Sequence, residues 1–196
     1  MTRRAPTGAA VLQPGITQAI TEAVLEEWAQ HGYARLSMEA VAKRAGVGKS
    51  ALYRRWPSKQ EMAMTVIAGF SVDRAVVPDT GSLRSDLRGA LEGLVAWITD
   101  PRFSRILPDL VAETSRNAEL GDFTRTMIGT PRRERSEAML HRAIARGELR
   151  KDIDLELVLD LIAAPLYWRL SVRSSPLEPD YLDKLTDLLL RSITTT

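Results

Sequence analysis

A short glycine-rich stretch, GVGKS from Gly46 to Ser50, contains the residue types that most directly suggest chemistry. Glycines let backbone amides approach a ligand closely, while the lysine supplies a cation and the serine a hydroxyl. Proteins place all three groups against phosphate. The stretch therefore indicates a partner that carries phosphate, either a nucleotide or the backbone of a nucleic acid.

A nucleotide-hydrolysing loop is the first interpretation, and the surrounding sequence argues against it. Such a loop needs the pattern G-x-x-x-x-G-K-[ST] between a strand and a helix. The first glycine of that pattern would stand at position 43, where the chain has Lys43, and the preceding MEAVAKRA is typical of a helix. The sequence also has no series of strand-like segments that could build a parallel sheet.

The second interpretation makes the same residues a turn between two helices that grip DNA. Helical spacing predicts a short helix over Met38–Ala45, capped by Ser37, and another over about Lys49–Arg55. Gly46 suits the left-handed backbone that ends the first helix, and Gly48 suits the cap of the second. Two short helices joined in this way form a helix-turn-helix, whose second helix enters the major groove.

Positive charge is concentrated around this turn. Residues 1–70 hold nine Lys/Arg against five Asp/Glu, whereas residues 71–196 hold 18 against 20. Between Arg35 and Lys59, seven cations stand against a single acid, Glu39. This distribution predicts a polyanionic partner for the first segment only.

The remaining segments also have helical periodicity, which predicts an all-α protein of about nine helices. A first helix ends at Gly32, a capping box at Ser58 opens a fourth helix, and Ser82 is expected to cap a fifth. Further helices are expected from Asp100 with a bend at Pro108, and over residues 119–128 and 132–146 with a break between them. Asp154 is expected to cap a helix over 155–172, and a last helix is expected from Pro179 to about Ile193.

The segment LSMEAVAKRAGVGKSALYRRWPSKQEM, residues 36–62, resembles the N-terminal domain of the tetracycline-repressor (TetR/AcrR) family. The shared features are S-x-E-x-V-A-x-x-A-G-V followed by K-x-x-L-Y-x-x-W-P-S-K. The later stretch RGELRKDIDLELVLDLIAAPLYWRL is similar to one that leads into the dimer-forming helices of such regulators. The family usually has Ser or Thr where this chain has Gly48, and often Thr where it has Ala51, so two hydroxyls that could touch DNA are missing.

The resemblance implies a sequence-specific, DNA-binding transcriptional regulator, most simply a dimeric repressor on a palindromic double-stranded operator. It further implies release from DNA by an apolar or amphipathic small-molecule effector. The expected domains are a flexible arm over residues 1–13, a DNA-binding domain over 14–74 with its helix-turn-helix at about 37–56, and a ligand-binding and dimerisation domain over 75–196. The alternative is a helical adaptor that uses the basic domain on an acidic protein partner.

Candidate residues follow from the motif and from the apolar faces of the later helices. The expected DNA contacts are Ser37, Arg44, Gly48, Lys49, Ser50, Tyr53, Arg54, Arg55 and Lys59. Expected to line a ligand pocket, unless they form a plain packed core, are Trp97, Phe103, Leu107, Leu110, Phe123, Met127, Met139, Tyr167 and Trp168. The expected dimer interface is Leu155, Val158, Ile162, Pro165, Leu166, Leu182, Leu185 and Leu189.

Other classes of function find no support in the sequence. The chain has no cysteine and only two histidines, His31 and His141, far apart, so we expect no metal site, no cofactor and no enzymatic activity. Arg3-Arg4 precedes an apolar run too short for an export signal. No stretch of about 18 apolar residues could span a membrane, so we expect a cytoplasmic protein.

Overall fold

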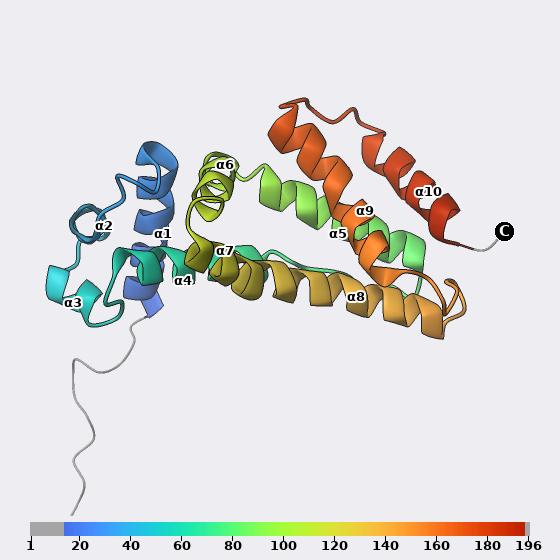
Figure 1. Ribbon diagram of the computed structural model, residues 1–196, viewed down its shortest axis with the longest axis horizontal. Helices are drawn as coiled ribbons and strands as arrows, with labels where there is room; N and C mark the ends of the chain where they lie inside the picture. Colours follow the sequence, from blue (N-terminus) through green and yellow to red (C-terminus); the bar gives the residue numbers. More distant parts are fainter. Residues whose placement is uncertain (1–13, 195–196) are drawn as a thin grey trace, which may run out of the picture. The chain divides into compact units, whose positions relative to one another are not determined.

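The structure is a computed structural model that describes residues 14–194, and every regular element in that range is helical (Figure 1). The α-helices are α1 (Pro14–His31), α2 (Met38–Ala45), α3 (Lys49–Tyr53), α4 (Lys59–Asp73), α5 (Leu83–Ile98), α6 (Phe103–Thr114), α7 (Ala118–Thr124), α8 (Thr130–Ala145), α9 (Leu155–Tyr167) and α10 (Tyr181–Ile193). Two π-helical turns, η1 (Arg125–Gly129) and η2 (Trp168–Val172), continue α7 into α8 and extend α9. Because α7, η1 and α8 are one unbroken run, the described chain has nine helical runs, and the all-α prediction is confirmed.

The chain divides into two compact units, residues up to Val66 and residues from Ile67. We call the described parts unit 1 (14–66) and unit 2 (67–194). The division falls inside α4, which is one continuous helix belonging partly to each unit. We therefore keep the end of α4 as the proposed limit of the DNA-binding domain. The predicted N-terminal arm, residues 1–13, lies outside the described residues.

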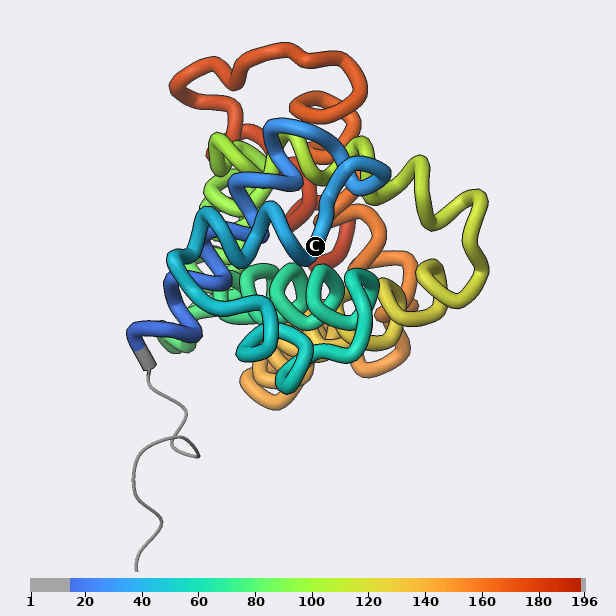
Figure 2. Tube along the Cα trace, turned by 90° about the vertical axis from the view of Figure 1, so that its left-hand side faces the viewer, coloured from blue at the N-terminus to red at the C-terminus, as the bar shows by residue number. Residues whose placement is uncertain are grey.

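Unit 1 packs α1, α2, α3 and the start of α4 around a small apolar core. Trp28 of α1, Val41 of α2, Leu52 of α3 and Met62 of α4 are almost completely buried. Figure 2 traces these helices in blue and cyan from a second direction. Since each helix contributes a buried side chain, even the short α3 has a fixed rotation about its own axis.

Unit 2 buries one face of each of four helices, α5, α8, α9 and α10, in a common core. Its fully buried members include Leu91, Leu140 and Leu166, and Leu189 of α10 is almost as buried. Leucine and isoleucine side chains supply most of this core. They recur every three or four residues along each helix, which is the spacing of one helical face. This arrangement places α9 and α10 beside α5, with one side of each helix left outward (Figure 1).

Most predicted helix starts are confirmed by the hydrogen bonds that cap them. Ser37 Oγ accepts from the Ala40 amide at 3.1 Å, Ser58 Oγ accepts from the Glu61 amide at 3.1 Å, and Asp154 Oδ1 accepts from the Leu157 amide at 3.0 Å. The cap predicted from Ser82 is wrong, because its side chain accepts no capping hydrogen bond. The carboxylate of Glu148 takes that role and accepts from the Leu83 amide at 2.7 Å.

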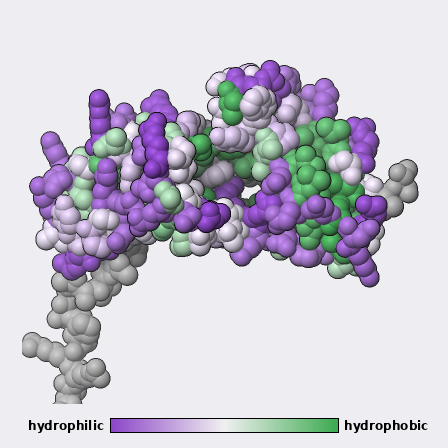
Figure 3. All heavy atoms as spheres, viewed as in Figure 1, coloured by the Kyte–Doolittle hydropathy of each residue, from purple (hydrophilic) through white to green (hydrophobic). Residues whose placement is uncertain are grey.

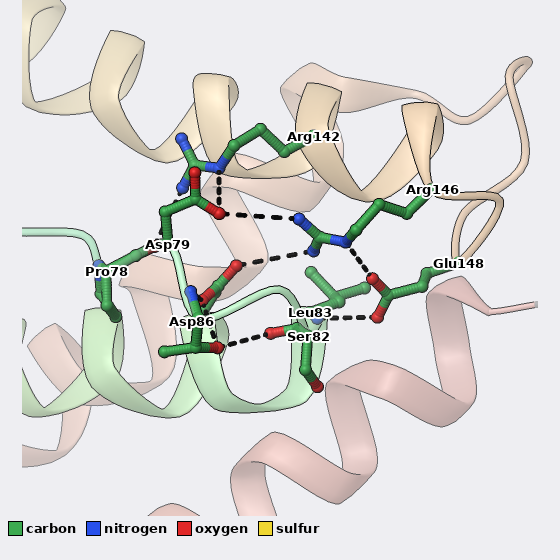
Figure 4. A network of polar contacts seen from close by, with 9 residues as sticks. Pro78, Asp79, Ser82, Leu83, Asp86, Arg142, Arg146 and Glu148 are labelled. Atoms are coloured by element: carbon green, nitrogen blue, oxygen red, sulfur yellow. Dashed lines mark hydrogen bonds and ion pairs between the residues drawn. The ribbon is translucent and has the colours of Figure 1, made fainter.

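Glu148 belongs to a polar network around the buried Asp86 that joins the start of α5 to the end of α8 (Figure 4). Arg146 lies between two carboxylates, with Nη2 3.5 Å from Asp86 Oδ2 and Nε 2.5 Å from Glu148 Oε1. Asp86 is fully buried, and its Oδ1 also accepts from the backbone amide and the hydroxyl of Thr80, each at 2.7 Å. On the rim of the network, Asp79 pairs with Arg142 at 3.3 Å.

These contacts lower the pKa of the Asp86 and Glu148 carboxyls. Burial alone would raise the pKa of Asp86, but the hydrogen bonds from Thr80 and the charges of Arg146 and Arg142 outweigh it. Burial also opposes ionisation of Glu148, whose pKa is lowered by Arg146 and by the Leu83 amide. Both groups therefore stabilise the fold when ionised, and that stabilisation is lost as the pH falls through their folded-state pKa values.

We predict that Asp86→Asn lowers the free energy of unfolding by about 2 kcal/mol at neutral pH, because Arg146 and Thr80 lose a charged acceptor. The deficit relative to wild type should shrink as the pH falls below the ordinary aspartate pKa of about 3.9 and through the lower pKa of the folded wild-type carboxyl. The measurement is urea unfolding followed by circular dichroism at several pH values. The control Asp79→Asn, at an exposed member of the network, should cost less than about 1 kcal/mol. Equal losses in the two variants would contradict the role of Asp86.

Candidate nucleic-acid interface and effector cavity

The turn between α2 and α3 has the backbone geometry of a helix-turn-helix. Gly46 ends α2 in the left-handed conformation, with φ of 66° and ψ of 30°. The Val47 amide donates back to the Ala42 carbonyl at 3.0 Å, which closes the end of α2. Gly48 is extended, with φ of −69° and ψ of 143°, and is the N-cap of α3. The chain thus reverses direction within three residues.

One side of α3 is fixed inside unit 1 and the other side faces outward. Leu52 is completely buried, whereas Lys49, Ser50, Tyr53 and Arg54 are exposed. Within the described chain, the structure records no hydrogen bond or ion pair for the guanidinium group of Arg54. The outward side of α3 therefore offers two cations, a hydroxyl and a phenol on a rigidly placed helix.

One acidic side chain, Glu39, lies beside the cations of this surface. Lys49 Nζ lies 3.4 Å from Glu39 Oε1, across the turn on α2. The pKa of Glu39 is lowered, first by a hydrogen bond from its own backbone amide and then by Lys49, so the acid is ionised at neutral pH. Both side chains are more than half exposed, so this pair is weak and Lys49 is free to exchange Glu39 for another anion.

Unit 2 contains a cavity of about 730 Å³. Its wall comes from the segment directly after α4, from α5, from η1 and α8, and from α9. Apolar lining side chains include Leu94, Trp97 and Ile162, and they are accompanied by several arginines and glutamates. This volume lies within the range of small-molecule sites, and its mixed wall can hold a ligand that has both apolar and charged parts.

Several large apolar side chains of α9, η2 and α10 are exposed among charged residues. Leu157, Leu161, Trp168 and Leu188 expose 56%, 40%, 59% and 58% of their surface, respectively. Figure 3 shows a broad hydrophobic area over the region of α9 and α10. We call this set, together with Val172, the apolar face. Exposed apolar side chains of this size are a candidate surface for contact with a partner.

Similarity to known proteins identifies the family to which this chain belongs. Residues 20–64 match the family described as "Bacterial regulatory proteins, tetR family", and residues 77–189 match "Tetracyclin repressor-like, C-terminal domain". The chain belongs to the tetR family. It is therefore a DNA-binding transcriptional regulator, and the helix-turn-helix of unit 1 is the family's DNA-binding element.

Individual relatives agree along nearly the whole chain. The HTH-type transcriptional regulator Rv1556 of Mycobacterium tuberculosis is 33% identical, covering 96% of this chain and 93% of its own. The DNA-binding transcriptional repressor TetR of Mycobacteroides abscessus is 31% identical, covering 88% and 90%. Among solved structures, the TetR family transcription regulator SCO0332 has a TM-score of 0.73 at 29% identity, covering 92% of this chain and 99% of that one.

Five of the nine expected DNA contacts of this tetR-family regulator lie together on the exposed turn and α3: Gly48, Lys49, Ser50, Tyr53 and Arg54. The other four have roles inside unit 1. Ser37 caps α2, Arg44 donates to Glu27 at 2.7 Å and to Gln30 at 2.9 Å, and Arg55 donates to Thr17 at 3.0 Å. Lys59 donates to the carbonyls of Tyr33 and Ala34 at 3.0 and 3.4 Å.

Two exposed cations were left out of the expected contacts. Arg35 and Lys43 are both exposed on unit 1 and both belong to its basic segment. The high positive charge of residues 35–59 was the signal that could have included them. Charge alone did not separate these outward cations from Arg44, Arg55 and Lys59, whose side chains are held within the unit.

The expected pocket residues of the tetR-family regulator are largely misplaced. Of the nine, only Trp97 lines the cavity. Phe103, Leu107, Leu110 and Met139 are buried in packed core, and Phe123 is half-buried outside the cavity wall. The expectation that Met127, Tyr167 and Trp168 point inward is wrong, because all three are exposed. The arginines that do line the cavity were not anticipated from an apolar pattern.

The expected dimer residues must also be corrected. Val158, Ile162, Leu166, Leu185 and Leu189 are buried in the core of unit 2 and cannot face a partner. Leu155, Pro165 and Leu182 are half-buried, and Leu155 and Leu182 pack against that core. The apolar face consists of other residues of α9 and α10, together with Trp168 and Val172 of η2.

Within residues 14–194, no group of three or more His, Asp or Glu side chains is placed to hold a metal ion. Across the same residues, no helix has the length and apolarity needed to cross a membrane.

We predict that Gly46→Ala lowers the free energy of unfolding by about 1 kcal/mol or more, because alanine is strained at a positive φ. Gly48→Ser is the matched control. Its extended backbone accepts any residue, and a serine there adds a helix cap, so stability should change by only a few tenths of a kcal/mol. Urea unfolding followed by tryptophan fluorescence measures both. A Gly46→Ala variant as stable as wild type would contradict the left-handed turn.

Proposed function

We propose that this regulator is a homodimeric repressor that binds a palindromic operator through α3 and is released by a small molecule bound in the unit 2 cavity. The observation that carries the proposal is the exposed side of α3, with Lys49, Ser50, Tyr53 and Arg54 presented on a helix locked by Leu52. It acts on DNA in the cytoplasm and has no catalytic role. Repression is supported by the similar protein of Mycobacteroides abscessus, which is named a DNA-binding transcriptional repressor.

The chemistry of α3 suits a DNA groove. The major groove is about as wide as one α-helix, and an arginine can donate two hydrogen bonds to a guanine. Arg54 is the exposed arginine of this surface, and we assign it a base or phosphate contact. Lys49 has only the weak pair with Glu39 and is assigned to phosphate. Gly48 and Ala51 bring no hydroxyl, so base recognition depends on the side chains of Ser50, Tyr53 and Arg54.

The apolar face supports dimerisation. Two copies that meet through the same surface form a closed, two-fold symmetric pair. Such a pair presents two α3 helices to two half-sites of a palindrome. The exposed leucines and Trp168 supply the large apolar side chains that dominate stable interfaces.

The residues that line the cavity support release of DNA by a ligand. Its wall includes Arg74 and Ala75, directly after α4, and α4 begins in the DNA-binding unit. A ligand that binds better to one conformation of this wall shifts the population of α4 conformations. DNA affinity then falls by the difference in ligand affinity between the two states.

We predict that the purified protein binds DNA immediately upstream of its own coding region with a steep dependence on salt. If each subunit neutralises about four phosphates, the log–log slope is roughly −7 for a dimer. Lys49→Gln should weaken binding and reduce the slope by roughly 1.8, one phosphate contact per subunit. Fluorescence anisotropy across a salt series measures the slope.

The matched control for this experiment is Arg150→Gln, which removes an exposed cation from unit 2. Its affinity and salt slope should equal those of the wild type. Arg54→Gln should lose discrimination between the operator and a scrambled duplex if it contacts a base. A wild-type slope near zero would contradict DNA binding through this basic surface.

We predict that Leu161→Glu converts the dimer to a monomer, because two-fold symmetry places a buried charge on both sides of the interface. Sedimentation velocity measures the change. Val111→Glu is the matched control, since Val111 of α6 is also exposed, at 44% against 40% for Leu161, but lies off the apolar face. A Leu161→Glu protein that remains dimeric would place the interface elsewhere.

A further inference from the structure

The cavity wall carries charged residues of both signs, and most of them are paired. The lining includes four arginines, Arg74, Arg125, Arg132 and Arg133, and three glutamates, Glu134, Glu137 and Glu156. Arg133 donates to Glu156 at 2.5 Å and to Asp160 at 2.8 Å, and Arg125 donates to Asp122 at 2.8 Å. Glu137 lies 3.4 Å from His141.

Arg132 and Arg74 differ from the other two arginines. The structure records no carboxylate within ion-pair distance of either side chain in the described chain. Arg132 donates to the carbonyl of Ser71, and Arg74 donates to the carbonyl of Phe70 at 3.3 Å. Both acceptors are neutral main-chain groups in the last turn of α4, so two guanidinium charges in the cavity wall remain uncompensated.

Each of these guanidinium groups also lies over an aromatic ring. The Arg132 Cζ atom is 3.7 Å from the centroid of the Trp97 ring, and the Arg74 Cζ atom is 3.7 Å from that of Phe70. Phe103 packs against both rings, with centroids 4.5 Å from Trp97 and 5.6 Å from Phe70. The three rings therefore form a continuous aromatic platform with an arginine at each end.

Two polar side-chain atoms near Arg132 have no hydrogen-bond partner in the described chain. The indole N–H of Trp97 is buried and has no acceptor in the described chain, and the buried hydroxyl of Ser71 has no partner there either. Desolvation, followed by the nearby charge of Arg135, lowers the pKa of Arg132 to about 10, which still leaves it charged at neutral pH. A half-buried cation beside an unmatched N–H donor is stabilised by an acceptor that carries negative charge.

We propose that the cavity takes an organic anion, an acidic group carried on an aromatic or apolar body, and that Arg132 and Arg74 hold its charge. The apolar part of the ligand lies along Leu94, Ile162 and the exposed edge of Trp97. An arginine fork suits the planar geometry of a carboxylate and the oxygens of a sulfonate or phosphate. A neutral ligand of the same shape leaves both charges uncompensated and binds more weakly.

The same contacts indicate how a bound anion would affect the end of α4, an inference that rests on the proposed release by a ligand. Arg132 holds the carbonyl of Ser71, and Arg135 holds those of Val72 and Ala75 at 2.5 and 3.0 Å. Arginines of α8 thus hold the carbonyl groups at the C-terminal end of α4. An anion that draws Arg132 toward itself takes one of these donors from α4 and loosens its last turn.

The test uses two fluorescent probes of nearly the same shape, anilinonaphthalenesulfonate, which is an anion, and phenylnaphthylamine, which is neutral. Titrations with the full-length protein without DNA give both dissociation constants. Arg132→Gln should weaken binding of the anion by about tenfold or more, since a charge-assisted hydrogen bond is lost, and leave the neutral probe unchanged. Arg132→Lys keeps the charge and should lie between the wild type and Arg132→Gln.

Arg116→Gln is the matched control, because it removes an equal charge from an exposed arginine outside the cavity wall. Its anion binding should equal that of wild type. Equal weakening of both probes by Arg132→Gln, or no weakening of the anion, would overturn the proposal. If thermal melting shows that Arg132→Gln is unfolded, Arg74→Gln provides the same comparison at the other end of the platform.

Hydrogen exchange measured by mass spectrometry tests the regulatory consequence separately. Amides in a peptide covering residues 67–76 should take up deuterium faster with the anionic probe bound and at an unchanged rate with the neutral probe. Unchanged exchange with the anion would overturn the loosening of α4. Neither readout contains DNA, so a failure of operator binding and a failure of anion recognition are distinguished.

Discussion

Cations that donate to main-chain carbonyls hold both ends of α4, and the two functions of the protein depend on this helix. At its start, Lys59 binds the carbonyls of Tyr33 and Ala34 and so fixes α4 to the loop between α1 and α2 within unit 1. At its end, Arg132 and Arg135 bind the last carbonyls within unit 2. Carbonyls at a helix C-terminus lack helical partners and carry partial negative charge, so cations stabilise them without needing a carboxylate.

The sequence was sufficient for the elements that are governed by local chemistry. Ser37, Ser58 and Asp154 were identified as caps, and Gly46 as the left-handed end of α2, because each effect involves residues at most four apart. The prediction that the Ser82 side chain caps α5 failed because the capping group is not local. The cap comes from Glu148, 65 residues further along the chain, and only the packed fold brings that carboxylate to Leu83.

The sequence was not sufficient where two sides of one helix are equally apolar. In α9, Val158 and Ile162 enter the core, while Leu157 and Leu161 stay exposed. Both sets have helical spacing, so periodicity indicates a helix but cannot tell a core side from a partner side. The sequence also could not tell which cations face outward. Arg44 and Arg54 both belong to the basic segment, but Arg44 binds Glu27 whereas Arg54 faces outward.

The position of Arg132 also limits how strongly a ligand can act. Coupling between two sites is reciprocal and cannot exceed the free energy of the interactions that differ between the two states. If a bound anion only removes the charge-assisted bond from Arg132 to Ser71, about 1.5–3 kcal/mol per subunit is at stake. This corresponds to roughly 10- to 100-fold in affinity for each subunit, and a dimer multiplies the two contributions. One relocated guanidinium group per subunit is therefore enough to account for a full regulatory response, without any larger rearrangement of the core of unit 2.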